Sequence, residues 1–148
     1  MSNDRNVTKN LIQTLEDGQK GFTDAAEKLS ESDRPHLATK FRDLADQRAR
    51  FSSELETMAA AYGDDIDEDG SLIAAAHRGW MSLKDALAGS DPDGVIEAAE
   101  QGEDHAVSEY SKALDEDISP DLRQTVQRQL TDIEQAHAEV KRMKDAPS

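Results

Sequence analysis

Residues 120–144 read PDLRQTVQRQLTDIEQAHAEVKRMK, and this stretch decides the fold. Its apolar side chains recur every three or four positions, which is the spacing of a helix that buries one face. The stripe consists of Val126, Leu130, Ile133, His137 and Val140. Ser119 is a good helix cap and Pro120 suits the first helical position, so we expect a long bundle helix to begin here.

Glu134 and His137 form a Glu-x-x-His pair within this helix. Residues three positions apart lie on one side of a helix, so both side chains can reach the same ligand. Ferritin-like carboxylate proteins use two such pairs, together with single carboxylates from two other helices, to hold two metal ions. The pair therefore makes binding of iron or manganese a hypothesis for the rest of the chain.

Length and charge restrict the remaining possibilities. The 148 residues suit a single domain, and 32 acidic against 17 basic side chains give a formal charge of −15. Such a charge repels phosphates and anionic lipid, so we expect no nucleic acid and no membrane as partner. The chain has no cysteine, which excludes disulfides and thiolate metal sites. Without a secretory signal or an apolar stretch long enough to span a bilayer, a cytoplasmic location is expected.

The whole chain has helical periodicity, and no segment alternates like a strand. In addition to the helix over 120–144, we expect helices over residues 4–29, 34–62, 71–88 and 92–115. The segment from Gly63 to Asp91, which contains the helix over 71–88, could span most of the length of the other helices once. The sequence therefore predicts a single all-α domain over 1–148, a ferritin-like four-helix bundle with a helical crossover between its second and third bundle helices.

Three polar residues interrupt the apolar stripes of the expected helices: Arg48, Glu103 and His137. Buried charges are costly unless they are paired, so these residues should meet one another or a metal ion. On the first helix, Gly18 and Gly21 leave one side thin, which favours close helix packing over a ligand cavity.

A ferritin-like metal site would take its ligands from all four bundle helices. Counting from the expected turns places Glu16 of the first helix, Glu103 and Glu134 at one level, beside His137. The second helix has Gln47-Arg48-Ala49-Arg50 at this level, in place of Glu-x-x-His, and Glu54 is its nearest acid. The candidate metal ligands are Glu16, Glu54, Glu103, Glu134 and His137.

A metal-free alternative uses the same residues as an ionic network. Arg48 can neutralise Glu103, and His137 can be satisfied by Glu134 or by a backbone carbonyl. Pairing of Glu103 with Arg48 or with a cation should hold the pKa of Glu103 below its value in the unfolded chain.

Short motifs also connect the chain to a known family. They are Asp17-Gly18-x-x-Gly21-Phe22, Gln47-Arg48, Glu54-Leu55, Gly70-Ser71, His77-Arg78-Gly79-Trp80, Gly102-Glu103-Asp104 with Tyr110, and His137. In these motifs the sequence resembles a bacterial family of four-helix-bundle proteins that is placed among the ferritin-like proteins. The resemblance implies the ferritin-like fold and a bacterial origin, but no particular activity.

Two functions stay open at this point. The first is a ferritin-like protein that binds iron or manganese in the bundle core and oxidises ferrous iron or consumes peroxide. The second is a metal-free structural, interaction or stress protein that acts through its surface. No helix has a second apolar stripe, so a monomer and a small homodimer are both compatible with the sequence.

Overall fold

The protein is all-helical in the part that the structure, a computed structural model, describes: residues 4–31, 35–61 and 92–145. Its helices are α1 (Asp4–Ser30), α2 (His36–Ala61), α4 (Pro92–Leu114) and α5 (Pro120–Asp145). Each begins and ends within two residues of the sequence-based expectation. The expected helix over 71–88, with its His77-Arg78-Gly79-Trp80 motif, lies outside the described residues.

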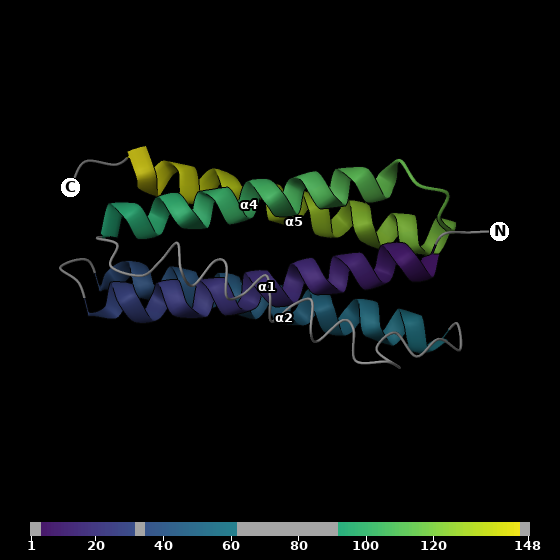
Figure 1. Cartoon of the computed structure of the whole chain (residues 1–148), viewed down its shortest axis with the longest axis horizontal. Helices are drawn as coiled ribbons and strands as arrows, with labels where there is room; N and C mark the ends of the chain where they lie inside the picture. The colour runs from purple at the N-terminus through teal and green to yellow at the C-terminus, as the bar shows by residue number, and fades with distance from the viewer. Residues whose placement is uncertain (1–3, 32–34, 62–91, 146–148) are drawn as a thin grey trace.

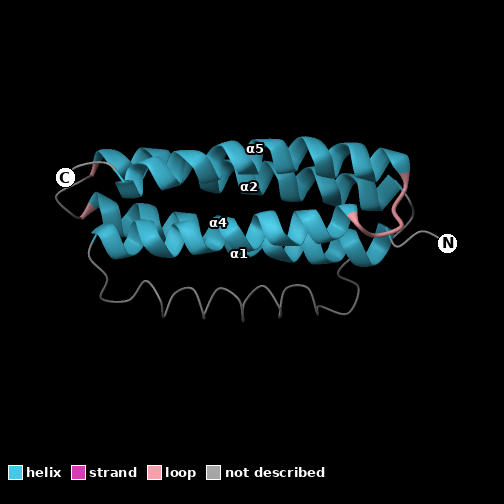
Figure 2. Ribbon diagram, turned by 90° about the horizontal axis from the view of Figure 1, so that it is seen from above, coloured by secondary structure: helices cyan, strands magenta, loops and turns pink. Residues whose placement is uncertain are grey.

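The four helices run side by side as an elongated bundle (Figure 1). α1 and α2 form one antiparallel hairpin, and α4 and α5 form the other. α2 and α4 point in the same direction, and the end of α2 and the start of α4 lie at opposite ends of the bundle. Seen from above, α1 lies beside α4 and α2 beside α5, so that α2 and α4 are diagonally opposed (Figure 2). No helix in the described ranges is long and apolar enough to cross a bilayer.

The bundle core is divided into two apolar halves. One half contains Leu11 and Leu15 of α1 and Phe51 and Leu55 of α2, and the other is built around Phe22, Leu29 and Phe41. All four helices change from one half to the other at the same level. The residues at this level are polar or lack a side chain: Gly18 on α1, Arg48 on α2, Glu103 on α4 and His137 on α5. The expected stripe of α5 is confirmed in part: Val126, Ile133 and Val140 are fully buried, whereas Leu130 and His137 are partly exposed.

Hydrogen bonds of the Asp4, Ser119 and Arg123 side chains hold the turn between α4 and α5. Asp4 of α1 accepts a hydrogen bond from the backbone N–H of Ser119 at 2.8 Å. The Ser119 hydroxyl in turn accepts a bond from the N–H of Leu122 at 3.3 Å, which confirms the predicted cap. Arg123 donates to the carbonyls of Leu114 and Glu116 at 2.7 and 3.0 Å, satisfying backbone groups at the end of α4. These bonds fix the register of α5 against α4, and with it the position of His137.

Candidate metal centre

The middle level of the bundle contains a fully buried ion pair. Nη2 of Arg48 donates to Oε1 of Glu103, and each side chain is only 1 % exposed. The two residues come from α2 and α4, so the pair crosses the centre of the bundle. The other carboxylate oxygen of Glu103 has no hydrogen-bond partner within the described residues.

Neighbouring residues accommodate the long arginine side chain. The guanidinium carbon lies 5.2 Å from the ring centre of Phe22, a cation–π distance, and Nε donates to Gln47 at 3.3 Å. Gly18 faces the methylene part of Arg48, where an added Cβ would lie 3.5 Å from Cγ. The space left by Gly18 is therefore used by a side chain of α2.

The expected direction of the Glu103 pKa was wrong. Burial raises the pKa of Glu103 above its ordinary value, and the favourable charge of Arg48 offsets this only in part. The prediction considered the attraction of the Arg48 charge, which lowers the pKa, but not the removal of water from the buried carboxylate, which raises it. For a carboxylate this deeply buried, desolvation has a larger effect on the pKa than one guanidinium.

His137 meets two carboxylates of α4. Its Nε2 lies 2.8 Å from Oδ1 of Asp104, a distance at which the groups attract each other when the imidazole is protonated. The two groups are not aligned for a hydrogen bond, and Nε2 has no hydrogen-bond partner in the described ranges. Glu100 stands one turn before Asp104 on the same side of α4. One ligand atom from each of Glu100, Asp104 and His137 lies within 4.8 Å of the others, so the three could hold a metal ion.

This cluster lies at the edge of the bundle between α4 and α5. Asp104 is 62 % exposed and the His137 side chain is 27 % exposed, whereas Glu103, the residue before Asp104, is completely buried. An ion held by the cluster would therefore be open to solvent on one side, with the Arg48–Glu103 pair on its inner side.

Other residues predicted as metal ligands have different neighbours. Glu16 accepts a hydrogen bond from Ser52 at 3.0 Å, and Glu134 is exposed. The pairing of Glu103 with Arg48 agrees with the metal-free alternative. The partner that the structure gives His137 is Asp104, rather than Glu134 or a carbonyl.

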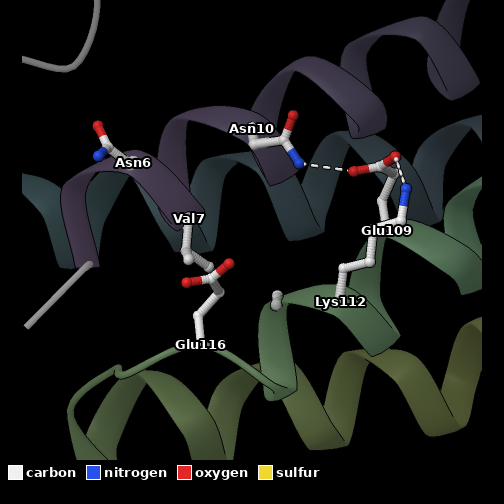
Figure 3. A pocket seen from close by; sticks show the side chains of 7 residues that line it. Asn6, Val7, Asn10, Glu109, Lys112 and Glu116 are labelled. Atoms are coloured by element: carbon white, nitrogen blue, oxygen red, sulfur yellow. Dashed lines mark hydrogen bonds and ion pairs between the residues drawn. The ribbon is translucent and has the colours of Figure 1, made fainter.

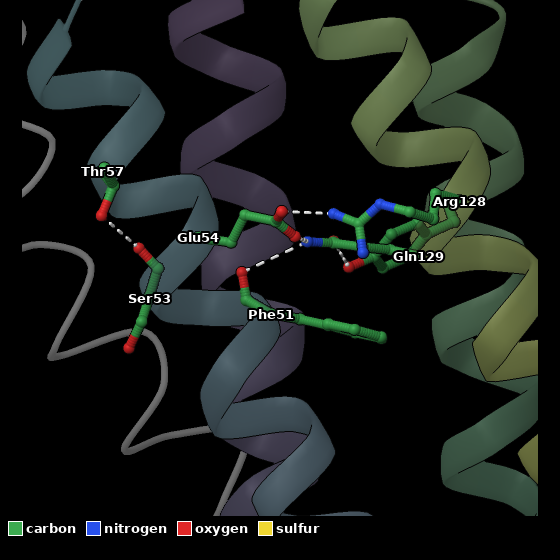
Figure 4. A network of polar contacts seen from close by, with 7 residues as sticks. Phe51, Ser53, Glu54, Thr57, Arg128 and Gln129 are labelled. Carbon is green, nitrogen blue, oxygen red and sulfur yellow. Dashed lines mark hydrogen bonds and ion pairs between the residues drawn. The ribbon is translucent and has the colours of Figure 1, made fainter.

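Glu54 belongs to a second polar network, between α2 and α5 (Figure 4). It forms an ion pair with Arg128 and accepts a bond from the Gln129 amide at 2.8 Å. The Arg128 hydrogen bond lowers the pKa of Glu54, with burial acting in the opposite direction. Gln129 also accepts a 2.6 Å bond from the hydroxyl of the buried Tyr110, whose pKa is raised mainly by burial. Glu54 is thus connected through Gln129 to the core, about one and two-thirds helical turns beyond Arg48 on α2.

Glu100 and Asp104 were not predicted as ligands from the sequence. Their spacing of four residues was the available signal, because it places two carboxylates on one side of a helix. The offset of α5 against α4 predicted from the sequence did not bring these two carboxylates next to His137. The contacts of Tyr110 with Gln129 and of Asp104 with His137 are symmetric about Pro120. The level predicted for Glu103 and Glu134 is instead symmetric about a point between residues 118 and 119, so the predicted partner of Glu103 on α5 lies about three residues too early.

Fold and site together define an acidic helical-bundle protein with a buried ion pair and a carboxylate–histidine cluster beside it. A family model described as Domain of unknown function (DUF2383) matches residues 5–117. That match covers α1, α2 and α4, and the chain belongs to this family. It ends before α5, so Glu100 and Asp104 lie inside the matched region and His137 lies outside it. No curated protein matches the chain.

Proposed function

We propose that the protein is a ferritin-like bundle that binds one iron(II) or manganese(II) ion at Glu100, Asp104 and His137. The observation that carries the proposal is the convergence of three ligand atoms within 4.8 Å of one another. The directions of the four helices support the ferritin-like part, because two antiparallel hairpins with parallel second and third bundle helices require one long connection.

The donor set suits these two metals. Carboxylate oxygens are hard ligands and imidazole nitrogen is a borderline one, a combination that iron(II) and manganese(II) accept. Three protein ligands leave coordination positions free for water or a small substrate. A metal ion binds the neutral imidazole, so the ion would take the position next to Nε2 of His137 that a proton could otherwise occupy.

A single ion fits the surroundings better than the pair of ions that the Glu-x-x-His pattern suggested. The fixed positive charge of Arg48 already lies against Glu103 in the centre of the bundle. A second metal ion bound to Glu103 would meet that charge in a buried, low-dielectric position, where repulsion is strong. Glu103 therefore acts in this proposal as an anion behind the site, and Glu16, Glu54 and Glu134 are not ligands.

Calorimetric titration with manganese(II), and with iron(II) under anaerobic conditions, tests the proposal. We expect one site per chain. Replacement of a ligand, as in Asp104→Asn or His137→Gln, should weaken binding by at least about tenfold. Magnesium should bind far more weakly, because it disfavours imidazole and keeps its water shell.

Matched substitutions separate a site from general attraction to an acidic surface. His105→Gln changes an exposed histidine of α4, and Asp121→Asn changes an exposed aspartate of α5. Both should leave the affinity unchanged. Equal losses in the matched and the site variants, or the absence of saturable binding in the parent protein, would refute the proposed site.

The buried ion pair favours a second candidate, a metal-free bundle whose partners bind its surface. Here Arg48 and Glu103 determine how the helices face one another, and the Asp104–His137 contact is a surface ion pair of little energetic weight. In this case the titration shows no saturable binding, and the His137→Gln protein unfolds like its parent.

A further inference from the structure

The buried carboxylate of Glu103 uses only one of its two oxygens in the bundle. Oε1 accepts a hydrogen bond from Arg48, whereas Oε2 is buried and has no hydrogen-bond partner within the described ranges. The side chain is 1 % exposed, so bulk solvent does not reach this oxygen. A buried carboxylate oxygen without a donor is costly, and most buried polar groups in proteins are bonded to protein or to ordered water. Oε2 therefore requires a donor that the described residues do not supply.

Glu109, which follows on the same helix, shows how side chains of the bundle satisfy both oxygens of a carboxylate (Figure 3). Its Oε2 accepts a 2.7 Å hydrogen bond from the Asn10 amide, and its Oε1 lies 3.5 Å from Nζ of Lys112. The Glu109 side chain is 16 % exposed, so it is less deeply buried than that of Glu103. The described residues thus give two partners to the carboxylate that needs them less, and one to Glu103.

Glu103 is a neighbour of all three proposed metal ligands. Glu100 stands three positions before it, a spacing that leaves only about 5–6 Å between two Cβ atoms on a helix. Asp104 is the next residue of α4. Burial raises the pKa of Glu103, and the charges of Arg48 and His137 oppose that rise, so the imidazole is close enough to act on the carboxylate. Because Glu103 is buried and Asp104 is exposed, Glu103 lies on the inner side of the site.

We infer that Oε2 of Glu103 accepts a hydrogen bond from a water molecule on the metal ion, which makes Glu103 a positioning residue of the site. The inference rests on the proposed metal function. With three protein ligands, the ion keeps coordination positions for water. A water on the inner side of the ion meets a carboxylate instead of solvent, and hydrogen bonds to an ionised acceptor are strong. Arg48 holds one oxygen of Glu103 in place, and the other oxygen orients the water.

The test is calorimetric titration of full-length variants with manganese(II). Removing Glu103 alone would strand the Arg48 charge, so both residues are replaced together. Arg48→Met with Glu103→Gln is compared with Arg48→Met with Glu103→Leu. Both side chains at position 103 are then uncharged and of similar size, but only glutamine keeps an oxygen that can accept a hydrogen bond. We expect the leucine protein to bind manganese(II) about fivefold more weakly than the glutamine protein. Arg48→Met alone, which keeps Glu103, should bind like the parent.

A matched pair at Glu97, an exposed acid of α4, provides the control: Glu97→Gln and Glu97→Leu in the Arg48→Met protein should bind manganese(II) equally well. A crystal structure of the manganese-loaded parent is the second measurement, and we expect a water on the ion at about 2.5–3.0 Å from Oε2 of Glu103. Equal affinities of the glutamine and leucine proteins, or a loaded structure without that water, overturn the inference and leave the metal site in place. Absence of saturable binding in the parent refutes the metal function itself, and the inference with it.

Discussion

Arg48 of α2 and Glu103 of α4 form an ion pair across the diagonal of the bundle, and each side chain is 1 % exposed. Apolar clusters lie on both sides of this level. A guanidinium in this position requires a carboxylate opposite it, so helix registers that separate the two residues leave buried charges without partners. The pair thus ties α2 to α4, two helices that are not adjacent.

Arg48→Met should strand the Glu103 carboxylate and destabilise the bundle by about 3 kcal/mol, as expected when one partner of a buried pair is removed. Urea unfolding followed by circular dichroism measures the loss. Arg50→Met, an exposed arginine of the same helix, is the matched control and should change stability little. Because Arg48 is not a metal ligand in the proposed site, added manganese should stabilise the parent and the variant by similar amounts and leave the difference between them in place. Equal stability of Arg48→Met and Arg50→Met would show that the pair does not hold the bundle together.

Gly18→Ala should stabilise the protein by about 1 kcal/mol, the usual helix preference of alanine over glycine. The new Cβ would lie 3.5 Å from Cγ of Arg48, which is ordinary van der Waals contact. Gly102→Ala is the comparison, because nothing lies within 4 Å of a Cβ at that position. Thermal unfolding of both variants measures the gains. If Gly18→Ala is less stable than the parent while Gly102→Ala is more stable, Arg48 needs the space that Gly18 leaves.

Asp17→Asn should change how stability depends on pH. Burial raises the pKa of Asp17 from 3.8 to about 6; Lys20 opposes the shift and Glu16 adds to it. A carboxyl with a raised folded pKa contributes stability below its unfolded pKa and loses it as pH rises through the folded value. The variant should therefore match the parent near pH 3.5 and exceed its stability by roughly 1 kcal/mol at pH 7.5, an amount reduced for solvent screening. Urea unfolding across this range decides, and a variant less stable than its parent at pH 7.5 would show that the carboxylate has a favourable partner.

Tyr110→Phe should destabilise the protein by about 2 kcal/mol, because it leaves Oε1 of the buried Gln129 without its donor. Replacing both residues, as in Tyr110→Phe with Gln129→Leu, should recover part of the loss, since Oε1 of Gln129, the acceptor that lost its donor, is then absent. The measurement is the free energy of unfolding in urea for the two single variants and the double variant. Strictly additive losses would contradict the hydrogen bond as the source of the effect.

Much of the fold could be predicted from periodicity. Most positions of the expected apolar stripes of α1, α2 and α4 are buried. Counting along the hairpins placed Arg48 at the level of Glu16 and Glu103; the structure pairs Arg48 with Glu103 but places Gly18 against it on α1. Periodicity determines which face of a helix is inside. It does not determine the offset between helices, which depends on turn contacts such as Asp4 with Ser119.

The candidate site depended on that offset. A displacement of about three residues moves one helix by roughly one turn, or about 5 Å. This is enough to replace Glu134 by His137 as the residue opposite Glu103 and Asp104. The direction of the Glu103 pKa needed the depth of burial, which the sequence pattern does not contain. The pairing of Glu103 with Arg48 could be predicted from the sequence, because it requires only that two opposite charges lie at the same buried level of the bundle.

The most direct test of the proposed metal centre is a crystal structure of the protein grown with manganese(II), with anomalous differences measured for the metal. We predict a single anomalous peak at the α4–α5 edge, coordinated by Glu100, Asp104 and His137, with the Arg48–Glu103 pair intact. Two peaks in the bundle centre that include Glu103 and Glu134 among their ligands, or no peak at the α4–α5 edge, would contradict the account.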